Sequence, residues 1–344
     1  MPVLRSLSRS ALLAGAALLA VASPSVLAQQ NLSVTEQRLV RSVDLNHDAT
    51  LALLEQLVNI NSGTMNLDGV RAVKDVMQPK LEALGFRTRW VPMEAETHRA
   101  GDLVAEHPCP TPGKCGKRIL LIGHMDTVFE KDSPFQKFAV DPASQGKIAS
   151  GPGVNDMKGG LVVMLSALRA MKAAGTLAHA HIRIVLSGDE ERAARPLAVA
   201  RHDMIEAGKW ADAALEFELL AREKGQDIGS VSRRGSITWT LKTTGHSGHS
   251  AGIFNTDGFG ANYELARIVD TFRRELREPD LTYSIGIMLG GVSVRPSATT
   301  EEAVGGTAEG KANIIAGQGY ATGDIRALQR SGAARRGQNA RDRR

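Results

Sequence analysis

The spacing of apolar residues along the chain predicts alternating helices and strands before about residue 226. Apolar residues recur at helical spacing across 51–84, and Gly85 follows as a C-cap. Two continuous apolar runs, 117–128 (KRILLIGHMDTV) and 180–191 (AHIRIVLSGDEE), are typical of buried central strands. A helix is predicted between them, and a third strand ends at Glu218. This alternation predicts an open α/β sheet with the functional site beyond the strand ends.

The pattern changes in the rest of the chain. The segment 235–250 alternates like a half-buried strand, and 257–276 has the pattern of an amphipathic helix. Further strands are predicted at 281–291 and 311–328. This order predicts a smaller α+β domain, a sheet with helices on one face, whose pattern stops with the last of these strands.

The N-terminal residues have the features of a secretory signal. A basic start precedes an apolar run from Ala11, and the small residues around Ala28 suit signal peptidase. We therefore expect a signal peptide at 1–28 and a periplasmic or secreted protein. The alternative is a membrane anchor, which needs about 20 apolar residues.

The chain has only two cysteines, and export would place them in an oxidising compartment. Cys109 and Cys115 lie among Pro and Gly in HPCPTPGKCGK, which favours one small loop disulfide. Free thiols are the first alternative. A metal site comes last, because it would need more thiols or histidines nearby.

The formal charge of +5 does not indicate a nucleic-acid partner, because of where the charge lies. The arginine-rich segment 330–344 carries the whole excess, and the body of the protein is near neutral. Its lack of apolar periodicity predicts a disordered tail, and its composition indicates out-of-frame translation. The alternative is a natural basic tail.

Ionisable residues follow each predicted strand and also occupy a glycine-rich loop, GPGVNDMKGG. They are His124, Asp126, Asp156, Glu190, Glu191 and Glu218. One such acid usually caps a helix or is solvated, but several at one sheet edge favour a metal site. Imidazole and carboxylates without thiolates suit zinc or cobalt in a hydrolytic centre. In an extended segment Asp126 points to the same side as His124, so we expect it to orient that ring rather than bind metal.

The combination of GHMDTV, GPGVNDMKGG and GDEE, over roughly 51–328, resembles the dizinc exopeptidases. That family includes bacterial glutamate carboxypeptidase (the carboxypeptidase G type), acetylornithine deacetylase, succinyl-diaminopimelate desuccinylase and aminoacylase. LVNINSGTMNLDGV and HMDTV are most similar to the glutamate carboxypeptidase branch. The resemblance implies an open mixed sheet with helices on both faces and a smaller α+β lid and dimerisation domain.

The resemblance also implies roles for the site residues. His124 and Glu218 would be terminal ligands of one zinc, Asp156 would bridge two zincs, and Glu191 would bind the other. Glu190 would be the general base for a metal-bridged hydroxide, and the neighbouring aspartate would have no direct role. The peptide bond after the bridging aspartate would be cis.

The smaller domain would supply groups that contact the substrate. By resemblance a histidine there donates to the oxyanion across a dimer, and we assign it to His249 rather than His246. Asn313 and Arg326 match positions that hold the free carboxylate of the substrate in relatives. The resemblance implies a homodimer. In this chain the incomplete lid argues against one.

The resemblance fails after Leu328, where relatives continue with more of the lid and a last histidine. Of the nine histidines in this chain none follows His249, so the zinc site of Glu191 is expected to be incomplete. We divide the chain into four parts: a signal peptide (1–28), a catalytic domain (29–225), an incomplete lid (226–329) and a basic tail (330–344).

Three functions follow. The first is a secreted zinc exopeptidase that hydrolyses a C-terminal amide bond and releases glutamate from a peptide or an N-acyl amino acid. The second is an N-acyl amino acid deacylase or dipeptidase of the same fold. The third is an inactive remnant that binds one metal.

Overall fold

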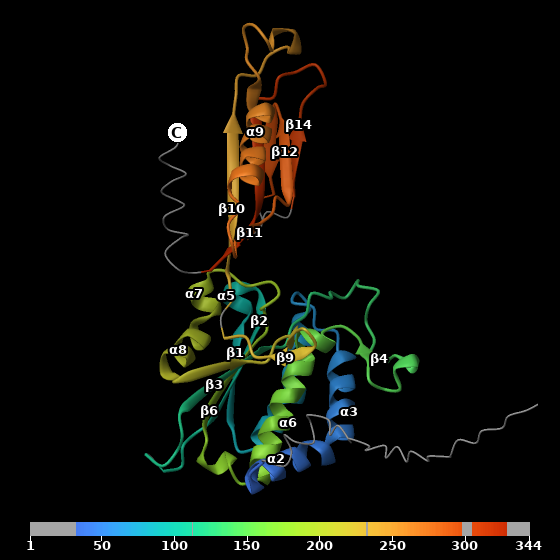
Figure 1. Cartoon of the computed structure of the whole chain (residues 1–344), viewed down its shortest axis with the longest axis vertical. Helices are drawn as coiled ribbons and strands as arrows, with labels where there is room; N and C mark the ends of the chain where they lie inside the picture. The colour runs from blue at the N-terminus through green and yellow to red at the C-terminus, as the bar shows by residue number, and fades with distance from the viewer. Residues whose placement is uncertain (1–31, 112, 232, 298–304, 329–344) are drawn as a thin grey trace, which may run out of the picture. The chain divides into compact units, whose positions relative to one another are not determined.

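The computed structural model describes residues 32–111, 113–231, 233–297 and 305–328, and it divides into two compact units, 1–219 and 220–344 (Figure 1). The expected signal peptide and the basic tail lie outside the described residues. Within these residues no helix is both long and apolar enough to cross a membrane.

The first unit is built on a five-stranded mixed sheet. The order is β1-β2-β6-β3-β7, with parallel pairing of β3 to β6 and β7 and antiparallel pairing elsewhere. The strands are β1 (Arg87–Met93), β2 (Arg99–His107), β3 (Arg118–His124), β6 (His181–Ser187) and β7 (Ala213–Glu216). The central strands β3 and β6 are the two apolar runs of the sequence, and both end at the same edge of the sheet.

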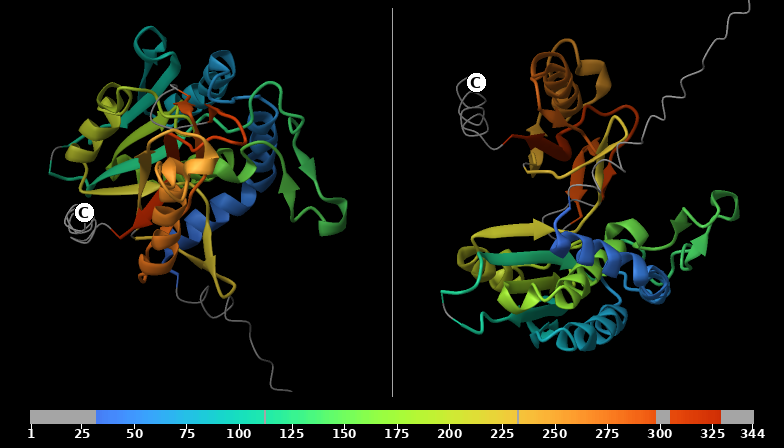
Figure 2. Two further views of the ribbon diagram at one scale, coloured as in Figure 1. Left: turned by 90° about the horizontal axis from the view of Figure 1, so that it is seen from above. Right: turned by 60° about the horizontal axis from the view of Figure 1, so that its bottom comes forward.

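Helices cover both faces of this sheet (Figure 2). One face packs against α3 (His47–Val58), α4 (Leu67–Glu82) and α6 (Gly159–Ala173) in a core that includes Leu57, Met77, Leu103, Leu121, Leu161 and Leu165. The other face packs against α8 (His202–Trp210) through Val104, Leu120, Val185 and Ala207. The predicted open mixed sheet with helices on both faces is therefore confirmed.

Other elements of the first unit connect or flank these layers. They are α2 (Val34–Leu45), α5 (Glu94–Thr97), β4 (Ala139–Val140), η1 (Pro142–Ser144), β5 (Ala149–Ser150), η2 (Val154–Lys158), η3 (Leu177–His179) and α7 (Leu197–Ala200). The loop after β2 is closed by the disulfide Cys109–Cys115, which confirms the first of the three alternatives for these cysteines.

The second unit contains an antiparallel sheet of β10 (Gly235–Thr244), β15 (Gln318–Ala327), β11 (Thr282–Tyr283) and β12 (Ile287–Gly291). One helix, α9 (Gly260–Glu275), packs on β10 and β15. Trp239 of β10 meets Phe272 of α9 edge-to-face, as expected for an amphipathic helix on a half-buried strand.

The remaining elements of the second unit are short: β8 (Ala221–Glu223), β9 (Gln226–Ile228), η4 (Ser250–Gly252), β13 (Ser293–Pro296) and β14 (Gly306–Glu309). The last strand differs from the sequence prediction, because 311–317 is irregular apart from a turn at 312–313 and an isolated bridge at Ile314, and β15 begins only at Gln318. Among the described strands, β10 is paired along one side only, with β15.

Candidate metal centre

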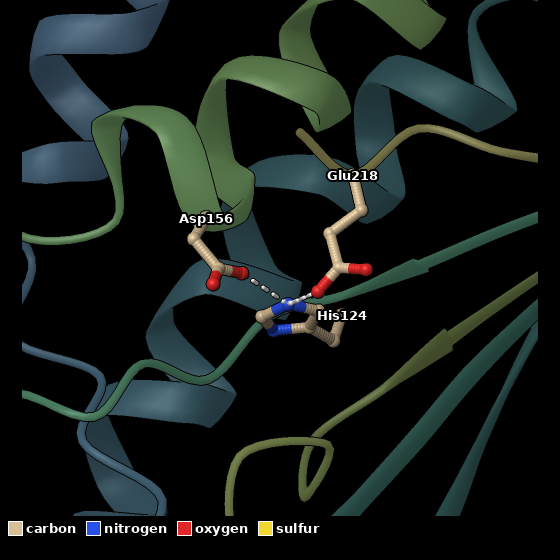
Figure 3. Close-up of side chains that lie close together, drawn as sticks. All are labelled: His124, Asp156 and Glu218. Atoms are coloured by element: carbon tan, nitrogen blue, oxygen red, sulfur yellow. Dashed lines mark hydrogen bonds and ion pairs between the residues drawn. The ribbon is translucent and has the colours of Figure 1, made fainter. Parts of the chain in front are cut away.

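Three side chains of the first unit converge at the edge of the sheet (Figure 3). His124 ends β3, Asp156 lies in η2, and Glu218 follows β7. One ligand atom from each lies within 4.8 Å of the others. His124 Nε2 is 3.0 Å from Asp156 Oδ1 and 3.9 Å from Glu218 Oε1. One imidazole and two carboxylates form a donor set that suits a catalytic zinc site with an open position.

Glycines allow these segments to approach one another. A Cβ on Gly160, at the start of α6, would lie 1.8 Å from the carbonyl oxygen of Phe217, the residue before Glu218. Gly153 has φ 74°, a left-handed conformation that favours glycine, and it precedes η2. The peptide bond Asp156–Met157 is cis, which confirms the expectation for this loop. The glycine-rich sequence therefore brings Asp156 and Glu218 to the end of β3.

The His124 ring is held on its other side by Asp126. Its Nδ1 lies 3.0 Å from the Asp126 carbonyl oxygen and 3.3 Å from Asp126 Oδ1, so Nε2 faces the carboxylates. Only 2% of His124 is exposed. Burial opposes protonation, but the hydrogen bond and charge of Asp126 raise the pKa of His124 to about 9. A metal must therefore compete with a proton for this nitrogen.

Asp126 does more than orient the ring. Its carboxylate is fully buried and accepts hydrogen bonds from Thr64 Oγ1 at 2.7 Å and from the backbone N–H groups of Glu190 and Glu191, each at 3.1 Å. One carboxylate thus connects the histidine to the acidic turn after β6. The roles of Thr64 and of these backbone bonds carry no signal in the sequence.

Glu190 and Glu191 lie beside the three-residue group. Burial raises the pKa of Glu190, and Glu218 is among the acids that add to the shift. Burial and the charge of Asp156 raise the pKa of Glu191 to about 7. These shifts indicate crowded carboxylates that share too little counter-charge, a condition that a bound cation relieves.

Two more buried charges near the centre were not anticipated as site residues. Lys158 is fully buried, its Nζ donates to the Ile60 carbonyl at 2.8 Å, and burial lowers its pKa to about 7. Asp189, the first acid of the run, is 1% exposed and pairs with Arg201. The composition of the run could have indicated that one acid needed a protein counter-charge, but not which residue supplied it.

The remaining predicted residues lie in the second unit. The side-chain amide of Asn313 lies 3.3 Å from His249 Nε2, and His249 also forms an isolated β-bridge with Ile314. Arg326 pairs with Asp324 near the other end of β15, a ten-residue strand that spans on the order of 30 Å. The chain therefore brings His249 and Asn313 together but not Arg326. His246 lies 3.8 Å from Asp257 instead.

The family is identified by comparison with known proteins. Residues 120–313 match the model of Peptidase family M20/M25/M40. The chain belongs to this family. The match includes the metal centre and most of the second unit, so the resemblance derived from the sequence motifs is confirmed.

Among curated proteins, carboxypeptidase G2 of Pseudomonas sp. strain RS-16 is 31% identical over 227 residues, covering 64% of this chain and 50% of that protein. Succinyl-diaminopimelate desuccinylase of Rhodospirillum centenum is 32% identical over 183 residues, covering 52% and 45%. The chain spans about half the length of the curated relatives it matches.

Solved structures of low sequence identity share the M20 fold. Aminopeptidase PepT of Bacillus cereus aligns with a TM-score of 0.57 at 18% identity, covering 83% of this chain and 68% of that one. A metallo-carboxypeptidase of Sulfolobus solfataricus aligns with a TM-score of 0.53 at 16% identity, covering 82% and 72%. These likenesses concern the fold alone.

Proposed function

We propose that the chain is the catalytic part of a secreted, zinc-dependent exopeptidase that hydrolyses a C-terminal amide bond and releases glutamate. The observation that carries the proposal is the convergence of His124, Asp156 and Glu218 beside two glutamates of raised pKa. Membership of the M20 family supports metal-dependent hydrolysis, and the similarity to carboxypeptidase G2 supports the carboxypeptidase activity.

We assign two zinc ions to the centre, with cobalt as the alternative metal. His124 and Glu218 would hold one ion, Asp156 would be shared, and Glu191 would hold the other. Bound zinc supplies a Lewis acid that activates water and polarises the scissile carbonyl. Asp126 fixes the His124 tautomer, because the carbonyl oxygen beside Nδ1 can only accept a hydrogen bond and so leaves Nε2 free for metal.

We assign the general base to Glu190. Its raised pKa, due mainly to burial, suits a carboxylate that accepts a proton from water near neutral pH and passes it to the leaving nitrogen. Glu190 is also fixed through its backbone N–H to Asp126. Because this bond involves the backbone and not the side chain, the Glu190 carboxylate can gain or release a proton while the turn stays in place.

We assign oxyanion stabilisation to His249. The backbone N–H of Ala251 donates to His249 Nδ1 at 3.1 Å, which makes that nitrogen the acceptor and places the ring proton of the neutral form on Nε2. An N–H at Nε2 is the donor that a tetrahedral intermediate needs. The Asn313 amide, whose nitrogen lies 3.3 Å from Nε2, must then turn its oxygen toward that N–H or move aside when substrate binds. Asn313, which lies beside His249, would bind the substrate carboxylate. Arg326 lies near the other end of β15, so it would share that role only from another copy of the chain in a homodimer. In this proposal 226–329 is a lid and dimerisation domain and 29–225 is the catalytic domain.

We also propose export, by way of a signal peptide at 1–28. The disulfide Cys109–Cys115 supports an oxidising compartment. Fractionation of a source that expresses the full chain, with mass spectrometry of the mature N-terminus, tests this. Cleavage after Ala28 is the expected result, and an intact N-terminus in the cytoplasm would contradict it.

The activity is tested by adding zinc or cobalt to the purified chain and measuring release of glutamate from a C-terminal glutamyl peptide. Release of acetate or succinate from N-acyl amino acids is measured in parallel. Faster release of glutamate is the expected result, with loss of activity on chelation. A preference for N-acyl substrates would favour the deacylase, which the similarity to succinyl-diaminopimelate desuccinylases supports.

A one-metal protein without turnover is the remaining candidate. The observation that favours it is that the ligand group found among the described residues has three members, enough for one ion. Metal analysis after dialysis decides between one and two ions per chain. One ion together with no hydrolysis of any substrate would support this candidate.

A further inference from the structure

The turn that carries Glu190 and Glu191 is held by side chains rather than by regular secondary structure. Residues 188–193 follow β6 without a helix or a strand. The peptide group that joins Asp189 to Glu190 is bound at both ends. Its N–H donates to Asp126 Oδ1 at 3.1 Å, and its C=O accepts from Arg201 Nη2, also at 3.1 Å.

Arg201 also binds the side chain of Asp189. Its Nη1 donates to Asp189 Oδ1 at 2.5 Å, and Asp189 Oδ2 accepts from the backbone N–H of Ala194 at 2.8 Å. Asp189 is 1% exposed, and the Arg201 side chain is 18% exposed. A buried carboxylate is strongly destabilising without a partner, so this aspartate depends on Arg201. One guanidinium thus holds both the side chain and the carbonyl of a single residue.

A second arginine holds the other side of the turn. Arg99, at the start of β2, donates from Nε to the carbonyl of Arg192 at 2.9 Å. The backbone on both sides of Glu190 and Glu191 is therefore bound by guanidinium groups from distant elements. Asp126 connects the same turn to His124. We call the hydrogen bonds that Arg201, Arg99 and Asp126 make to this turn the frame.

The frame divides the three consecutive acids by function. The first is neutralised inside the protein by Arg201, so its charge is unavailable to a metal. The next two lie next to Asp126, and Asp156 and Glu218 converge on His124 close by, so like charges crowd this side of the turn. Without the hydrogen bonds from Arg201, we expect this repulsion to move the turn outward. Metal ligands and bases need positions fixed to within about 0.5 Å for full effect.

We propose that Arg201 is a positioning residue, which holds Glu190 and Glu191 in place through Asp189. This inference rests on the proposed function for the roles of the two glutamates. Its direct effect on the turn does not rest on that function, because Arg201 binds the side chain and the carbonyl of Asp189 whatever the reaction.

The test uses the full chain with Arg201→Met, Arg201→Lys and a matched control, Arg118→Met. Arg118 also pairs with an aspartate, Asp212, but it begins β3 and so lies a whole strand away from His124. The first measurement is amide hydrogen exchange in the metal-free protein, detected by mass spectrometry on the peptide that contains Glu190 and Glu191. The second is the affinity for cobalt(II), measured by titration with the visible absorption of the bound ion as the signal. The third is the separation of kcat from KM for glutamate release.

We expect amide exchange at the turn to be at least about tenfold faster in Arg201→Met and unchanged in Arg118→Met. Cobalt affinity of the site that includes Glu191 should fall by about 10- to 100-fold, the usual range when a group that orients a metal ligand is removed. kcat should fall with little change in KM, and Arg201→Lys should recover part of the loss.

Unchanged exchange at the turn in Arg201→Met would overturn the inference. So would faster exchange with unchanged cobalt affinity and kcat, because Arg201 would then serve only the fold. If the unmodified chain hydrolyses none of the substrates, the proposed activity fails. The role of Arg201 is then decided by two measurements, hydrogen exchange at the turn and cobalt affinity.

Discussion

The two histidines at the centre of the proposed mechanism have opposite surroundings. His124 is buried, with one ring nitrogen against Asp126 and the other facing the carboxylates of Asp156 and Glu218. His249 is exposed at the start of a short helical turn, with Ala251 N–H and the Asn313 amide as its partners. Folding thus fixes the orientation of the proposed metal ligand, whereas the group that would meet the substrate stays at the surface.

The units that carry these histidines differ in the same way. The first unit has a large core on both faces of its sheet and buries three acids: Asp102, Asp126 and Asp189. Among the described residues of the second unit, the buried side chains are few and none is acidic. A deep core can hold charges close together at a fixed geometry, which is what a metal centre requires.

The largest effect is expected from removing the buried histidine. His124→Ala should lower metal affinity by more than about 100-fold, a larger loss than follows removal of a group that only orients a ligand, and it should abolish turnover. Metal content after dialysis measures this. His249→Ala is the control and should retain its metal. Equal loss of metal from both variants would break the comparison between the two histidines.

The next effect concerns the adjacent glutamates. Glu190→Gln should retain metal yet lower kcat by about two to four orders of magnitude, because the amide cannot accept the proton. Glu191→Gln should instead lose the ion that this residue would hold. Metal analysis and steady-state kinetics on both variants separate the roles. The opposite pattern would mean that the two assignments must be exchanged.

A smaller loss is expected at the exposed histidine. His249→Ala should lower kcat by about 10²- to 10³-fold, the cost of one oxyanion donor, without a change in metal content. His246→Ala is the matched control from the same segment and should have ordinary turnover. Full activity in His249→Ala with loss in His246→Ala would move the role to the other histidine.

The smallest effect concerns a buried acid of the first unit. Burial raises the pKa of Asp102 to about 8, and the charge of Asp189 adds to the shift. The unfolded chain releases this proton near pH 4 and the native protein near pH 8, so the native state binds the extra proton between them. Its contribution to stability is present below about pH 4 and falls as pH rises to about 8.

Asp102→Asn removes this titration. Between pH 5 and 9, we expect its free energy of unfolding, measured by urea titration, to fall by about 1–3 kcal/mol less than that of the unmodified chain. Asp212→Asn is the control, since its exposed partner Arg118 lowers the pKa of Asp212 to about 2 and places its effect at acid pH. Identical curves for Asp102→Asn and the unmodified chain would show that this carboxyl does not titrate in this window.

Much of the fold and of the metal centre could be predicted from the sequence. Continuous apolar runs identified β3 and β6, and their polar ends identified His124 and the acidic turn. The glycine-rich loop around Asp156 was also recognised in the sequence, and the structure adds that Gly160 allows it to approach the backbone of Phe217. These features are local, because side-chain periodicity and backbone freedom are properties of neighbouring residues.

The tertiary structure alone decided which charges compensate one another. Arg201 lies 12 residues after Asp189, and Asp126 lies 64 residues before Glu190, yet these residues form one hydrogen-bonded network. It also decided that the length of β15 separates Asn313 from Arg326. Such pairings depend on strand order and on burial, which set the dielectric around each charge, and no periodicity along the chain records either of them.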